Sequence, residues 1–154
     1  ESPTGIVNVQ SIAREPGVVA LMAGVNDLRR SLGVPPDAPR SSISLALQSI
    51  VLAARAAGVA AFDGVYNNLE DPEGLARECE EGRQMGFDGK SIIHPSHIEI
   101  ANNAFSPSGP AVEQARNLVE AFTGGAQRYD GRMIEAMHVE EAKALIERAE
   151  AHRR

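Results

Sequence analysis

Cysteine and tryptophan are almost missing from this sequence. Tryptophan is absent, and Cys79 is the single cysteine among 154 residues. One cysteine cannot form an intramolecular disulfide, which excludes a disulfide-stapled secreted domain and favours a reducing cytoplasm. No uninterrupted apolar run reaches the roughly 18 residues that a membrane-spanning helix needs. We therefore expect a cytoplasmic protein without a membrane partner.

Basic charge and nucleotide-binding motifs are also lacking. The formal net charge is -6, and no basic stripe of the kind that binds nucleic acid is present. Neither a GxGxxG nor a GxxxxGK[ST] motif occurs, so the sequence contains no dinucleotide or P-loop signature. A hydrophobic content of 43% with 23% charged residues is ordinary for a globular domain. The chain opens on Glu-Ser-Pro-Thr-Gly rather than Met, and we expect it to be part of a longer protein.

Short apolar runs alternate with amphipathic segments along the chain. We predict strands within 18–27 and over 59–66 and 90–93, and helices over 5–14, 28–32, 41–57, 71–86, 110–122 and 139–151. This alternation indicates βα units and a parallel sheet. Because three strands do not close a barrel and an open sheet would leave exposed edges, a partial (β/α)₈ barrel fits best.

Several helix boundaries are marked by capping residues. Ser41 or Ser42 is predicted to cap the helix that Gly58 ends. Asp71, followed by proline, is a favoured N-cap for the next helix, which Gly86 closes. Cys79 falls on the packed face of that helix, and we predict a buried core residue.

Asp27 follows the first apolar run and has two interpretations on local grounds. Aspartate is a favoured helix cap, which would make Asp27 structural. It could equally serve as an oxygen ligand of Mg²⁺, which takes one or two carboxylates together with waters and substrate oxygens. Glu1 could supply the second carboxylate if it lies at a neighbouring strand end. The residues alone leave both interpretations open.

Other polar segments carry weaker signals. His94 and His97 lie three residues apart across a proline, a poor zinc pattern that favours a structural or substrate-contacting role. The polar run 63–71 suits either an active-site loop or a turn before a capped helix. Segment 129–135 is predicted to be a turn between two helices, with Met133 and Ile134 docked on a neighbouring element.

Taken together, these stretches resemble the citrate lyase beta-subunit family, which includes citryl-CoA and malyl-CoA lyases. The matching segments, in the order of the family, are 1–5 (ESPTG), 24–28 (GVNDL), 63–66 (DGVY), 71–75 (DPEGL), 86–96 (GFDGKSIIHPS), 104–108 (AFSPS) and 130–135 (DGRMIE). Each motif is modest by itself, whereas their joint order over nearly the whole chain is specific.

The resemblance implies a fold and a set of binding residues. It implies that residues 1–105 are the C-terminal part of a TIM barrel and that 106–154 form a helical lid extension. In the family Glu1 and Asp27 would hold Mg²⁺, which would bind an α-keto acid or the hydroxyacyl end of an acyl-CoA thioester. The backbone around Gly24, Val25 and Asn26 would bind the substrate carboxylate.

Two further segments acquire roles from the same resemblance. His94 and Pro95 would line the CoA side of the pocket. Glu135 would be the catalytic acid that the C-terminal segment delivers to the site of a neighbouring subunit, in a homotrimer or hexamer. Three positions depart from the pattern: Asn26 stands where many members have Glu, Glu135 where many have Asp, and His97 where Gln is common.

The sequence therefore predicts a Mg²⁺-dependent carbon–carbon lyase. It would join or separate an acetyl-CoA-type enolate and an α-keto acid of the glyoxylate or oxaloacetate class. A 2-hydroxyacyl-CoA thioesterase is an alternative. Glu135 has one methylene more than the Asp common in the family, which moves the carboxyl group by more than roughly an ångström and could change the reaction. A non-catalytic barrel subunit of a complex is the other alternative.

Overall fold

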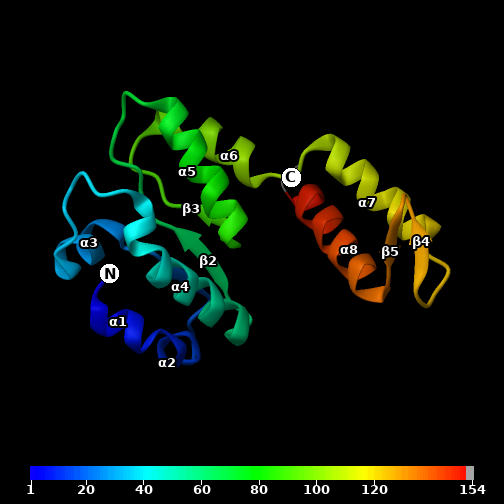
Figure 1. Ribbon diagram of the computed structural model, residues 1–154, viewed down its shortest axis with the longest axis horizontal. Coiled ribbons are helices and arrows are strands. Elements are labelled where there is room, and N and C mark those ends of the chain that lie inside the picture. The colour runs from blue at the N-terminus through cyan, green and yellow to red at the C-terminus, as the bar shows by residue number, and fades with distance from the viewer. Residues whose placement is uncertain (152–154) are drawn as a thin grey trace. The chain divides into compact units, whose positions relative to one another are not determined.

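The computed structural model describes residues 1–151 of the chain (Figure 1). It divides into two compact units, Glu1–Phe105 and a second that begins at Ser106. The first contains the sheet and most of the core, and the second contains two helices and a hairpin. Each is described by itself below.

The first unit is built on a three-stranded parallel sheet. Strands β1 (Ala20–Met22), β2 (Ala60–Asp63) and β3 (Gly89–Lys90) lie in the order β1-β2-β3. Their parallel register pairs Ala20 with Ala60 and Phe62 with Gly89. This arrangement confirms the predicted alternation of strands and helices, and it places the carboxyl ends of all three strands at one edge. Barrel closure stays a prediction.

Helices connect and cover these strands. They are α1 (Pro3–Val7), α2 (Val9–Ala13), α3 (Val25–Leu32), the 3₁₀ turn η1 (Arg40–Ile43), α4 (Ser44–Ala57), α5 (Pro72–Met85), the 3₁₀ turn η2 (Pro95–His97) and α6 (Ile98–Phe105). The main core joins α4 to the sheet through buried residues such as Leu47, Ala54 and Ala61. A second cluster joins Leu75 and Cys79 to α6. Burial therefore confirms the core role of Cys79, and it raises the pKa of that thiol.

The predicted strands were too long. β2 ends at Asp63 rather than Tyr66, and β3 covers Gly89–Lys90 rather than 90–93. Ile92 and Ile93 are exposed, because β3 pairs only with the short β2 and their β-branched side chains find no neighbouring strand. Gly89 pairs with Phe62 in the sheet, and an added Cβ at position 89 would lie 3.1 Å from the Phe62 ring.

The predicted capping residues Asp71, Gly58 and Gly86 are confirmed. The Asp71 carboxylate accepts a hydrogen bond from the Gly74 N–H at 2.8 Å, and Gly58 and Gly86 end their helices with φ of 69° and 98°. The serine cap predicted for α4 is wrong. The Ser42 hydroxyl donates to the Pro39 carbonyl within η1, and the α-helix begins only at Ser44.

Three other predicted helices also have different bounds, and the one predicted over 139–151 begins at Ala136. The segment 5–14 is interrupted at Asn8, which separates α1 from α2. The helix predicted to begin at Leu28 begins at Val25, and it follows Gly24 without a side-chain cap. This shift puts Asp27 inside the first turn of α3.

The second unit contains α7 (Gly109–Ala121), β4 (Gln127–Tyr129), β5 (Arg132–Ile134) and α8 (Ala136–Ala151). The turn predicted over 129–135 lies at Asp130–Gly131, and the flanking residues, which were not predicted as strands, form the antiparallel pair β4 and β5. Asp130 and Gly131 both have positive φ, as a two-residue hairpin turn requires. Side chains alternate along β5, so Met133 is 68% exposed and Ile134 is buried. Of the two residues predicted to dock on a neighbouring element, Ile134 is buried and Met133 is not.

None of the helices within residues 1–151 is long and apolar enough to span a bilayer.

Candidate functional site

Glu1 and Gly24 pack against each other beyond the end of β1. A Cβ added to Gly24 would lie 2.4 Å from the Glu1 Cβ and 3.1 Å from its Oε2. Any larger residue at position 24 would therefore displace the Glu1 side chain. The sequence prediction that Glu1 lies beside the Gly24–Asp27 segment agrees with this contact.

Asp27 is neither a cap nor a loop residue. It lies in the first turn of α3, where a carboxylate favours the positive end of the helix dipole. Its Oδ1 accepts a 2.7 Å hydrogen bond from the Arg30 Nη2. The side chains of Arg30 and Asp27 are 79% and 55% exposed, so this ion pair is solvated and weak. The Asp27 carboxylate is accessible to a ligand.

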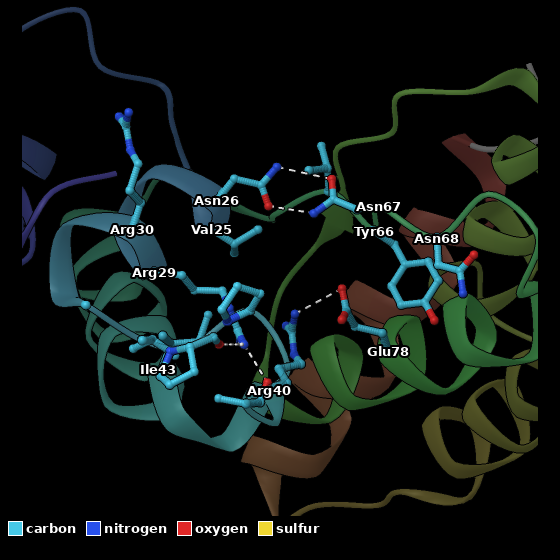
Figure 2. A pocket seen from close by; sticks show the side chains of 16 residues that line it. Val25, Asn26, Arg29, Arg30, Arg40, Ile43, Tyr66, Asn67, Asn68 and Glu78 are labelled. Atoms are coloured by element: carbon cyan, nitrogen blue, oxygen red, sulfur yellow. Dashed lines mark hydrogen bonds and ion pairs between the residues drawn. The ribbon is translucent and has the colours of Figure 1, made fainter.

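A cavity of about 780 Å³ opens beside this segment (Figure 2). Its lining consists of Val25, Asn26, Arg29, Arg30, Gly33, Val34, Pro35, Pro36, Ala38, Arg40, Ile43, Val65, Tyr66, Asn67, Asn68 and Glu78. Three of these side chains are arginines and one is a carboxylate. Arg30 is paired with Asp27 and Arg40 with Asp63 and Glu78, whereas Arg29 contacts backbone carbonyls and supplies a positive charge that favours an anionic ligand. Val25 and Asn26 are the predicted substrate-binding residues that line it.

Arg29 holds the loop that forms one side of the cavity. Its Nη2 donates to the Ala38 carbonyl and, at 3.4 Å, to the Pro35 carbonyl. Prolines in this loop restrict its backbone further. The loop between α3 and η1 is thus fixed to the helix that carries Asp27.

A buried charge cluster supports the other side of the cavity. Arg40 contacts Asp63 at 2.7 Å and Glu78 at 3.1 Å, while Lys90 contacts Asp63 at 2.9 Å and Glu78 at 2.6 Å. The side chains of Asp63 and Lys90 are fully buried. An added Cβ at Gly82 would come within 2.8 Å of the Asp63 carboxylate, so glycine makes room for it. The carboxylates of Asp63 and Glu78 each contact both cations, and the half-exposed Glu81 lies 3.7 Å from the Arg40 Nε.

Sequence reasoning missed this cluster. Asp63 belongs to the polar run 63–71, and its neighbours in the sequence do not indicate a contact with Arg40 or Lys90. One available signal is Lys90, the first residue of the predicted strand 90–93, because an unpaired lysine is almost never fully buried.

Tyr66 connects the cavity to α5. Its hydroxyl donates a 2.7 Å hydrogen bond to Asp71 Oδ2, while the other oxygen of that carboxylate caps α5. The hydrogen bond raises the pKa of Tyr66 to about 12 and lowers the pKa of Asp71. Gly74 is required here, since an added Cβ would lie 2.1 Å from both partner oxygens.

This pair predicts a stability loss at alkaline pH. The folded pKa of Tyr66, about 12, lies above its ordinary value of 10.0. The hydrogen bond therefore contributes its full stability below about pH 10 and none once pH exceeds the folded pKa. We expect Tyr66→Phe to be less stable than wild type at neutral pH, with the difference shrinking between about pH 10 and 12. Urea unfolding across this range measures it, and a difference that stays constant would contradict the assignment.

His94 and Pro95 do not line the cavity. The His94 Nδ1 accepts from the Ser96 N–H at 3.2 Å and caps η2, so its visible role is structural. His97 is buried, with its ring 6.5 Å from that of Tyr66 and 6.2 Å from that of His94, and its Nδ1 has no hydrogen-bond partner among residues 1–151. Within residues 1–151, no group of three or more His, Cys, Asp or Glu residues is arranged to hold a metal ion. A CoA-contacting role for His94 and Pro95 stays a prediction.

Glu135 lies in the second unit, between β5 and α8. Its backbone N–H donates to His138 Nδ1 at 3.0 Å, and its side chain is exposed. The exposed Glu135 carboxylate comes directly after the last residue of the β4–β5 hairpin. Its predicted role in the site of a neighbouring subunit stays a prediction.

A known protein family matches most of the first unit. The model of the HpcH/HpaI aldolase/citrate lyase family matches residues 1–95, the segment that contains the sheet, Glu1, Asp27 and the cavity. The chain belongs to this family. Family membership confirms the resemblance drawn from the sequence motifs.

Curated relatives of the HpcH/HpaI aldolase/citrate lyase family match almost the whole chain. The (3S)-malyl-CoA thioesterase of Cereibacter sphaeroides is 41% identical over 98% of this chain and 55% of its own length. The citrate lyase subunit beta of Haemophilus influenzae is 37% identical over 98% of this chain and 54% of its own length. The chain thus spans about half the length of the curated relatives it matches.

Solved structures of the family share the fold. CitE from Mycobacterium tuberculosis, in complex with magnesium, acetoacetate and coenzyme A, has a TM-score of 0.82 and 30% identity, covering 95% of this chain and 57% of its own. The citrate lyase beta subunit of that organism, complexed with oxaloacetate and magnesium, has a TM-score of 0.64 and 34% identity over 70% of this chain and 50% of its own. Both complexes contain magnesium and a keto acid, which is acetoacetate in the first and oxaloacetate in the second.

Proposed function

We propose that this chain forms the larger part of a Mg²⁺-dependent site that acts on the CoA thioester of a 2-hydroxy acid. The reaction is carbon–carbon cleavage, or its reverse, between an acetyl-CoA-type enolate and an α-keto acid. The observation that carries the proposal is the position of Glu1, whose side chain fills the space left by Gly24, one helical turn from Asp27.

The donor set fits the metal. Mg²⁺ prefers oxygen ligands and usually takes one or two carboxylates, with substrate and water oxygens completing its coordination. Glu1 and Asp27 are exposed carboxylates, and Asp27 engages only one oxygen with a solvated arginine. When bound, Mg²⁺ supplies Lewis-acid stabilisation of charge on a substrate oxygen.

The chain's own groups would position the substrate. The Val25 N–H already donates to the Ala23 carbonyl at 3.1 Å, so Gly24 and Asn26 are the amides that we assign to the substrate carboxylate. The arginine-rich cavity would attract the anionic substrate, with His94 and Pro95 on the CoA side. Glu135 of a neighbouring copy, in a homotrimer or hexamer, would exchange the proton of the 2-hydroxyl group or of the enolate carbon.

Thioester hydrolysis is the second candidate. It is favoured by the relatives with 41% identity, which are malyl-CoA thioesterases. The same metal and carboxylate contacts would hold the substrate, whereas water would add at the thioester carbonyl and the CoA thiolate would leave. The barrel interior and its early strands would come from the rest of a longer protein.

The two reactions differ in their products. With (3S)-malyl-CoA and the full-length protein, we expect glyoxylate and acetyl-CoA in equal amounts, without release of free thiol. Hydrolysis would instead give malate and free CoA without glyoxylate. Chelation with EDTA should stop turnover, and added Mg²⁺ should restore it. If malyl-, citramalyl-, methylmalyl- and citryl-CoA all stay intact, the chain is a non-catalytic subunit.

A further inference from the structure

A reciprocal amide pair joins the segments that follow β1 and β2 (Figure 2). Asn26 Nδ2 donates to Asn67 Oδ1 at 3.1 Å, and Asn67 Nδ2 donates to Asn26 Oδ1 at 2.7 Å. The two residues are 41 positions apart in the sequence, and both are exposed and line the cavity. Figure 2 shows the two side chains reaching toward each other across the cavity wall.

The pair is not explained by core packing. Exposed neutral hydrogen bonds exchange readily with water and contribute little net stability. Such a pair does provide a fixed geometry. Two antiparallel hydrogen bonds between side-chain amides set both the separation and the orientation of the partner side chains.

The first turn of α3 is held on one side by the buried side chains of Val25 and Leu28, and the Val25 N–H donates to the Ala23 carbonyl. Gly24 precedes the helix and offers no side-chain cap, so the exposed side of the turn lacks the usual capping contact. Asn26 therefore holds, through its side chain, the same turn that carries Asp27 and the Gly24 and Asn26 amides.

Asn67 is itself anchored. The adjacent Tyr66 is hydrogen-bonded through its hydroxyl to Asp71, and Asp71 caps α5. A continuous series of contacts thus runs from the start of α5 to the first turn of α3.

We propose that Asn67 is a positioning residue that, through its amide pair with Asn26, sets the geometry of the turn bearing Asp27 and the carboxylate-binding amides. This inference rests on the proposed function for the identity of the bound groups. Because the pair is neutral, it orients the turn without adding charge beside the metal ligands.

The first test is Asn67→Ala in the full-length protein. A shift of about 1 Å in a binding group costs up to roughly a hundredfold, so we expect kcat/KM for (3S)-malyl-CoA to fall about tenfold and Mg²⁺ affinity in calorimetric titration to weaken several-fold. The melting temperature should stay close to that of wild type. Asn103→Ala, an exposed asparagine on α6 outside the cavity, is the matched control and should change neither value.

Two further variants separate positioning from general damage. Asn67→Gln keeps a neutral amide that can still hydrogen-bond to Asn26, whereas Asn67→Leu has a similar size and cannot. We expect Asn67→Gln to retain more of the wild-type kcat/KM and Mg²⁺ affinity than Asn67→Leu. Neither variant adds charge beside Glu1 or Asp27, so the comparison isolates the amide pair.

Unchanged kcat/KM and Mg²⁺ affinity in Asn67→Ala would overturn the inference, as would equal losses in Asn67→Gln and Asn67→Leu. A wild-type protein that binds Mg²⁺ but turns over no acyl-CoA would instead overturn the proposed reaction. In that case the metal titration still tests the role of Asn67.

Discussion

Replacing Asp27 by asparagine is expected to abolish most Mg²⁺-dependent turnover. Lewis-acid stabilisation by a metal contributes several kcal/mol to the transition state, so its loss lowers kcat/KM by about a thousandfold. Asparagine keeps the size of the side chain and its place in the first turn of α3 while removing the charge. Kinetics and Mg²⁺ titration of the full-length protein measure the effect, and Glu1→Gln should act in the same direction.

The control for Asp27→Asn must lose a similar ion pair without touching the site. Glu80 pairs with Arg83 at 2.6 Å in the same i,i+3 geometry on α5, and both side chains are about half exposed. Glu80→Gln should therefore leave kcat/KM and Mg²⁺ affinity unchanged. If Asp27→Asn behaved in the same way, the metal would have to be held by other residues.

The second large effect concerns stability. We expect Lys90→Met to lower the free energy of unfolding by about 3–5 kcal/mol, the range found when one partner of a buried ion pair is removed. Lys90 is fully buried and contacts both Asp63 and Glu78. Methionine matches its length but leaves Asp63 with Arg40 as its remaining cation.

Urea unfolding compares this variant with an exposed lysine. Lys143 pairs with Glu140 at 3.3 Å on α8, and both side chains are more than half exposed. Lys143→Met should change the free energy of unfolding by less than about 1 kcal/mol. A change of similar size in the two variants would show that the buried cluster adds no more than a surface pair.

The buried cluster also bears on the cavity. Glu78 Oε1 contacts both Lys90 and Arg40, so two cations fix the carboxylate that lines the cavity wall. Loss of Lys90 would therefore disturb both the fold and the electrostatics of the binding surface. For this reason the stability of Lys90→Met must be measured before its kinetics are interpreted.

Local sequence determined the features that one or a few neighbouring residues decide. Asp71 caps α5 and Gly86 ends it, because capping and left-handed backbone conformation depend on the residue itself. The burial of Cys79 followed from helical periodicity. The family motifs were recognisable for the same reason, since short segments in a fixed order can be read without coordinates.

Tertiary structure decided whatever depends on residues distant in the sequence. The lengths of β2 and β3 depend on available partner strands. Arg40 reaches Asp63 across 23 positions, and Asn26 reaches Asn67 across 41. Propensity and periodicity describe a residue's neighbours along the chain, whereas these contacts arise only when parallel strands bring their carboxyl ends to one edge of the sheet.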